Sequence, residues 1–128
     1  MNEELIWKAS FLEQQCGELQ NNLEIIEKQI LELGTFKLNI EFFSKSNETK
    51  MLSSVGKGVY VKTDLLDKKL FVEVGAGVIV KKTSAQIEKI ITDQIQRLSE
   101  ARGPLAARLK DYNQTLKDIL SEIEKSKE

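Results

Sequence analysis

The chain has 128 residues, of which 30% are charged and only 6% are aromatic. This composition is typical of long solvated helices with a narrow apolar seam, and it has fewer aromatic residues than a compact globular domain of this size would need for its core. The 19 basic and 20 acidic side chains are intermixed along the same segments, whereas a nucleic-acid binder would carry a basic stripe.

The residues that usually carry catalysis and metal binding are scarce. The sequence contains no histidine, which is the commonest general base and the commonest metal ligand. Its single cysteine, Cys16, can form neither an intramolecular disulfide nor a cysteine metal cluster. We therefore expect a protein that is not an enzyme and that needs no cofactor or metal.

The features of membrane and secreted proteins are missing as well. No apolar run approaches the roughly 18 residues that span a bilayer. The chain starts with the acidic Glu3 and Glu4, where a secretory signal would have a basic segment before an apolar stretch. The expectation is a cytoplasmic protein with neither a nucleic-acid nor a membrane partner.

Residues 1–43 predict a first coiled-coil helix. Apolar side chains recur every seven residues at d positions: Leu5, Leu12, Leu19, Ile26, Leu33 and Ile40. A second series occupies the a positions: Ala9, Cys16, Leu23 and Ile30. An alternation sustained over about five heptads is the signature of a coiled coil. The seam weakens at Lys37, which would be the next a position.

Residues 48–82 change to short, β-branched runs of about six residues, which predict strands. The pattern V-G-x-G-V-x-V-K occurs twice, as VGKGVYVK at 55–62 and VGAGVIVK at 74–81. Two copies imply two similar β-hairpins, whose paired glycines supply positive φ angles or bulges at tight turns. Residues 63–68 predict the joint between the hairpins.

Residues 84–125 predict a second coiled-coil helix. Its d positions are Ile91, Leu98, Leu105, Tyr112 and Ile119, and its a positions are Ile95, Leu109, Leu116 and Ile123, with Arg102 as the exception. Thr83 and Gln86 fit a capping box at the start. Gly103 and Pro104 are expected to interrupt the helix with a kink near residues 100–104, because proline lacks the backbone donor and clashes with the preceding turn.

The two helical segments are about equal in length, about 60 Å each at 1.5 Å per residue. An antiparallel fold-back would place residue n opposite about residue 127 − n, with a gross apolar contribution of tens of kcal/mol along the seam that chain ordering largely offsets. The predicted fold class is α+β, a long antiparallel coiled-coil hairpin with two β-hairpins between the helices.

Two heptad helices that flank paired V-G-x-G-V-x-V-K hairpins resemble the α-class subunit of prefoldin, of the archaeal type, over essentially the whole chain. The second copy, VEVGAGVIVKKTSAQ leading into a helix, looks most like that family's characteristic stretch. Two hairpins is the α-class arrangement, whereas the β class has one. The Gly103–Pro104 pair is a visible departure from the family pattern.

The resemblance implies one prefoldin-like domain over residues 1–128, whose strands close into a β-barrel with those of other subunits. Members of the family hold unfolded proteins at the ends of their coiled coils without ATP and pass them to a chaperonin. The implied partners are unfolded clients, a group II chaperonin, and either a β-class subunit in a hetero-hexamer or further copies in a homo-oligomer. A filament-forming variant is an open alternative.

The two chain ends carry apolar side chains beyond the seam, which is what grasping unfolded chains requires. The candidate client-binding residues are Leu5, Ile6, Trp7, Phe11, Leu12, Ile119, Leu120 and Ile123. The alternative interpretation is that Trp7 and Phe11 only cap the coiled coil or pack in a bundle.

The strands are too small a patch to stand alone, which favours strand pairing between subunits over a private sheet. The candidate oligomerisation residues are Val59, Tyr60, Val61, Val72, Val78, Ile79 and Val80, with their faces left unassigned. The run VGAGV at 74–78 lacks the third glycine of a dinucleotide fingerprint, since position 80 is Val80. Cys16, on the seam, is expected to be a small buried hydrophobe and not a reactive thiol.

Overall fold

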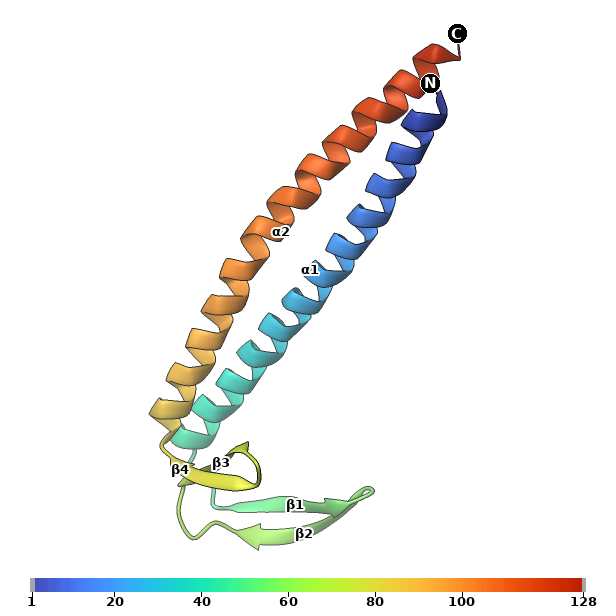
Figure 1. The fold of residues 1–128 in the computed structure, drawn as a ribbon. Coiled ribbons are helices and arrows are strands. Elements are labelled where there is room, and N and C mark those ends of the chain that lie inside the picture. The colour runs from blue at the N-terminus through green and yellow to red at the C-terminus, as the bar shows by residue number, and fades with distance from the viewer. Residues whose placement is uncertain (1, 128) are drawn as a thin grey trace. The chain divides into compact units, whose positions relative to one another are not determined.

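The computed structural model describes residues 2–127 and contains two long helices with four strands between them (Figure 1). The elements, in chain order, are α1 (Asn2–Lys45), β1 (Lys50–Gly56), β2 (Val59–Asp64), β3 (Leu70–Gly75), β4 (Val78–Lys82) and α2 (Ser84–Ser126). The predicted fold class is thereby confirmed. That the chain acts as one domain remains a prediction.

The chain divides into two compact units. The terminal unit combines residues up to Glu32 with residues from Gln94 onward, and the hairpin unit comprises Leu33–Asp93. Each unit therefore contains a stretch of α1 and a stretch of α2, and only the hairpin unit contains strands.

The heptad seam of the terminal unit follows the sequence pattern. Ala9, Cys16, Leu19 and Leu23 are buried on α1. Every other predicted seam side chain of this unit is half-buried, except Arg102, which is exposed. The two helices run antiparallel in this unit (Figure 1), and a hollow of about 410 Å³ is lined by Leu23 of α1 together with Ala106 and Leu109 of α2. Leu23 of α1 therefore lies opposite a part of α2 that is slightly C-terminal to the position predicted by the fold-back rule.

The predicted second helix is continuous, because α2 stays helical through Gly103 and Pro104, and the kink expected near residues 100–104 stays a prediction (Figure 1). Pro104 has no N–H, so the carbonyl of Glu100 loses its partner within the helix. Residues 100–104 are all exposed, so Pro104 is on the solvent side of α2. Water can therefore satisfy the freed carbonyl, and the seam contacts on either side keep the helix continuous.

The hairpin unit has its own small core. Ile40, Ile87 and Ile91 are its buried side chains, with Ile91 only 2% exposed. The linker between the hairpins is tied to α1, since Lys68 Nζ donates a hydrogen bond of 3.0 Å to the Phe43 carbonyl. The start of α2 has the predicted capping box: Thr83 N–H donates to Gln86 Oε1 at 2.9 Å, and Gln86 N–H donates to Thr83 Oγ1 at 3.2 Å.

The strands form two separate antiparallel hairpins, β1 with β2 and β3 with β4. Both copies of the sequence repeat fold alike. The turn residues Lys57 and Gly58 have φ angles of 47° and 81°, and their counterparts Ala76 and Gly77 have 51° and 75°. The register shifts before Gly56 and before Gly75, so each hairpin has an irregularity at the same place. The glycines thus supply the positive φ angles and bulges predicted for them.

The buried seam position Ile91 provides a test of the helix pairing in the hairpin unit. Ile91→Ala should lower the free energy of unfolding by about 2–5 kcal/mol, because it removes a buried side chain and leaves a cavity. Ile90→Ala is the matched control, since Ile90 is 40% exposed, and it should cost no more than about 0.5 kcal/mol. Urea unfolding at a fixed chain concentration measures both; equal costs would contradict the register.

The continuity of α2 through Pro104 provides a second test. Pro104→Ala should raise the free energy of unfolding, by up to about 3 kcal/mol, since it restores a helical hydrogen bond. Gly103→Ala should add about 0.5–1 kcal/mol, because an added Cβ meets nothing within 4 Å. Circular dichroism during thermal unfolding reports both changes. A lower unfolding temperature for Pro104→Ala would mean that the proline is required for the native shape of α2.

Candidate protein-binding surfaces

The N-terminal end of α1 and the C-terminal end of α2 lie side by side in the terminal unit, and they carry the first candidate surface (Figure 1). Ile6, Trp7 and Phe11 of α1 are 51%, 66% and 49% exposed, and Leu120 of α2 is 52% exposed. We call these four side chains the tip surface. Four large apolar groups left in water at the end of a helix pair make this region a candidate interaction site.

The eight predicted client-binding residues divide into two groups. Leu5, Leu12, Ile119 and Ile123 are half-buried, because they occupy the seam between the helices. The other four form the exposed tip surface. A heptad assignment anticipates this division, since the half-buried residues are at a or d positions and the exposed ones are not.

The two aromatic rings of the tip surface are arranged by helix geometry. Trp7 and Phe11 are four residues apart, so their side chains lie above one another on α1. Their ring centroids are 5.8 Å apart and the rings are nearly parallel, with an interplanar angle of 10°. The pair offers a flat apolar area that can contact many shapes of partner, because it imposes little directional geometry.

The hairpins carry the second candidate surface. Of the seven residues predicted for oligomerisation, six are exposed and Val72 is half-buried. The strand register now assigns their faces, since Ser53 pairs with Val61 and Val72 pairs with Val80. One face, which we call the valine face of each hairpin, carries Val59 and Val61 in the first hairpin and Val72, Val78 and Val80 in the second. Tyr60 and Ile79 lie on the opposite faces.

Some exposed apolar side chains of the hairpins were missed by the sequence reasoning. Leu52 and Phe71 are 62% and 65% exposed, and they lie on the same faces as Tyr60 and Ile79. Lys81 extends over the Phe71 ring, with its Nζ 5.8 Å from the ring centroid. The 19-residue repeat, extended toward the N-terminus, makes Leu52 and Phe71 equivalent positions, so the signal was present in the sequence.

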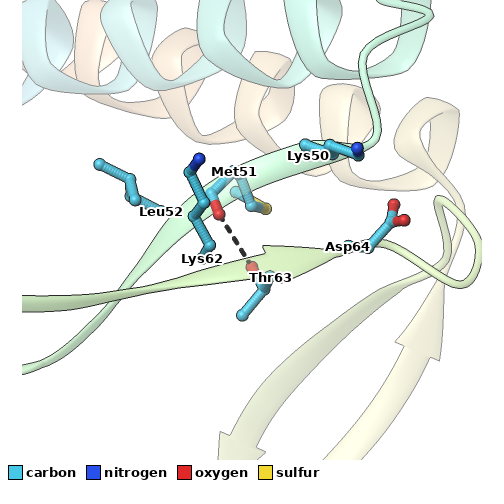
Figure 2. Close-up of a pocket in the computed structure, with 6 residues that line it drawn as sticks. All are labelled: Lys50, Met51, Leu52, Lys62, Thr63 and Asp64. Carbon is cyan, nitrogen blue, oxygen red and sulfur yellow. Dashed lines mark hydrogen bonds between the residues drawn. The ribbon is translucent and has the colours of Figure 1, made fainter.

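The first hairpin also forms an open hollow of about 610 Å³, shown in Figure 2. Its lining is mixed: Lys50, Met51, Leu52, Lys62, Thr63 and Asp64. Thr63 Oγ1 donates to the Met51 carbonyl at 3.2 Å and lies 2.8 Å from Ser53 Oγ. These contacts join the two strands. All the lining residues come from β1 and β2, so the hollow is the uncovered face of a two-stranded sheet.

Each hairpin has open backbone edges. Within residues 2–127 the first hairpin makes no strand pairing with the second, so every strand has one side without a ladder partner. Unpaired N–H and C=O groups along an edge are a template for pairing with another chain. The exposed valine faces and the open edges together describe a surface suited to joining other strands.

The remaining chemistry of the described residues is limited. Between residues 2 and 127, no group of three or more His, Cys, Asp or Glu side chains could hold a metal ion. No helix in the same range is long and apolar enough to cross a membrane.

The structure is a coiled-coil pair of helices with two β-hairpins between them in the chain, and it exposes apolar groups on both the helices and the hairpins. The family model for prefoldin subunits matches residues 12–127, and the chain therefore belongs to the prefoldin family. Prefoldin is a family of chaperones that work as oligomers, so the role of this chain is of the prefoldin chaperone type.

Three archaeal proteins named prefoldin subunit alpha are similar to the chain. The Pyrococcus horikoshii protein is 29% identical, over 96% of this chain and 78% of its own length. Those of Methanococcoides burtonii and Archaeoglobus fulgidus are 28% and 26% identical, over 95% and 94% of this chain and 85% and 90% of their own. The α-class resemblance predicted from the sequence is thereby confirmed.

A solved structure is similar as well. It is a filamentous PFD from Methanocaldococcus jannaschii, determined by cryo-electron microscopy, which is 19% identical and covers 94% of this chain and 95% of its own, with a TM-score of 0.49.

Proposed function

We propose that the chain is a subunit of an ATP-independent holdase, which binds unfolded proteins at its tip surface and passes them to a group II chaperonin. The observation that carries this proposal is the exposure of Ile6, Trp7, Phe11 and Leu120 at the ends of the two helices. Membership of a chaperone family supports the same conclusion.

The physical basis is transient burial of apolar surface. An unfolded chain presents apolar side chains in no fixed geometry, and the tip surface can cover a few of them at a time. Each contact is weak, since burying one large side chain contributes about 1.5–3 kcal/mol before ordering costs. Several tips acting on one client give a combined affinity that a single tip lacks. Release needs no nucleotide, because each contact dissociates readily on its own.

The hairpins supply the assembly that multiple tips require. We place the subunit contacts on the valine faces and open strand edges, with strands of neighbouring subunits completing a β-barrel. The favoured partner is a prefoldin β-class subunit in a hetero-hexamer. The alternative is self-assembly into a homo-oligomer or filament, which the same open edges allow. The mass of the particle formed by this chain alone, and with a β-class subunit, distinguishes these outcomes.

We also place this activity in the cytoplasm. The chain needs no disulfide, and Cys16 is a free thiol buried in the seam, which suits a reducing compartment.

The tip assignment predicts which residues suppress aggregation. The triple variant Trp7→Ala, Phe11→Ala and Leu120→Ala should need at least about tenfold more assembly to suppress aggregation of a denatured model protein, since each lost contact removes about 1.5 kcal/mol. The control is Ile25→Ala with Leu31→Ala, because these α1 side chains of the same unit are 55% and 72% exposed but lie away from the helix ends. Both variants should keep the native particle mass. Equal suppression by both would refute the tip assignment.

The hairpin assignment predicts what holds the particle together. Val61→Lys combined with Val80→Lys puts a charge on the valine face of each hairpin, and burying an unpaired charge between subunits is costly. The assembled particle should fall to single chains in native mass spectrometry. Leu66→Lys is the control, since Leu66 is fully exposed in the linker between the hairpins, and it should leave the mass unchanged. An intact particle with both valines replaced would place the subunit contacts elsewhere.

A further inference from the structure

The tip surface lies among acidic side chains. Within residues 3–18 of α1 there are four glutamates, Glu3, Glu4, Glu13 and Glu18, against the single cation Lys8. At the corresponding end of α2, residues 111–127 hold four acids and three lysines. The apolar side chains of the tip surface are therefore surrounded by a net negative charge, which comes mainly from α1.

The acids are close to the aromatic pair. Glu3 and Glu4 precede Trp7 by four and three residues, so they are its neighbours on the preceding turn of α1. Glu4 Oε1 is 3.9 Å from Lys8 Nζ, and both side chains are more than half exposed, so this ion pair is weak. Among the described residues Glu3 and Glu13 have no ion-pair partner, which leaves their charge available to a bound chain.

The rings add a second attraction for cations. The face of an aromatic ring carries partial negative charge, and an ammonium or guanidinium group above it is stabilised. Trp7 and Phe11 are stacked on each other, so each still has an outward face. A lysine or arginine of a bound chain can thus contact a ring face and a nearby carboxylate, while the apolar side chains of the same bound chain pack on the rest of the tip surface.

We infer that the tip surface selects unfolded segments in which lysine or arginine stands beside apolar residues, over acidic segments of equal hydropathy. This inference rests on the proposed holdase function and defines the client class that its site prefers. Charges within a Debye length of about 8 Å at physiological salt contribute, so the selection is modest and depends on ionic strength. The expected preference is about three- to tenfold at low salt and declines as salt rises.

The experiment uses the full chain in its native assembled form. Three labelled disordered peptides share the same apolar residues and carry four lysines, four glutamates or four serines at matched positions. Fluorescence anisotropy at 50 mM and 500 mM salt gives their dissociation constants. The lysine peptide should bind about three- to tenfold more tightly than the glutamate peptide at low salt, and the ratio should approach one at high salt.

Two charge variants separate the local effect from net charge. Glu3→Gln, Glu4→Gln and Glu13→Gln together should remove most of the preference and leave binding of the serine peptide unchanged. The matched control is Glu24→Gln, Glu27→Gln and Glu32→Gln, which removes the same charge from exposed positions on α1 away from the tip. This control should keep the preference.

The outcomes distinguish this inference from the proposed function. Equal affinities for all three peptides, or a preference that survives the Glu3, Glu4 and Glu13 variant, would overturn the charge selection and leave the holdase function standing. If no peptide binds, both are overturned. Trp7→Ala with Phe11→Ala should weaken all three peptides, whereas the charge variant should change only their ratio.

Discussion

The structure depends on the packing of α1 against α2 along a narrow seam of a and d side chains. This seam is the main place where the chain buries apolar groups, and few side chains become well buried there, with Ile91 the most enclosed of those described. A two-helix seam covers one stripe of each helix and leaves the rest in water. The remaining apolar side chains must therefore stay exposed or be covered by other chains.

This constraint links the two candidate surfaces. At the ends of the helices the seam residues Leu5 and Ile123 are already half-buried, so the added apolar groups Trp7 and Phe11 have no place within the pair. In the hairpins each sheet has only two strands, which cannot bury either face by themselves. Both surfaces thus follow from a chain with too few layers to enclose its own apolar side chains.

Much of the fold could be predicted because its signals are local. The heptad spacing identified the seam positions, and the repeated V-G-x-G-V-x-V-K identified the hairpins and their turns. The heptad pattern also predicted that the second helix continues past Pro104, whereas the local rule for proline alone would have ended it, because that rule ignores the seam contacts on both sides of the proline. The strand faces required the structure, since the irregularities before Gly56 and Gly75 change which residues alternate together. The client-binding role of the helix ends stays a prediction, and the burial of each side chain was needed to separate the four exposed residues of the tip surface from the seam residues.

The burial of Cys16 between the helices makes local separation of α1 and α2 measurable. It is the chain's single cysteine, it occupies an a position, and only 8% of it is exposed. A thiol-specific reagent can reach it only when α1 and α2 separate locally. The rate at which the Cys16 Sγ atom is labelled therefore reports how often the two helices separate at this position, and no cysteine has to be introduced for the measurement.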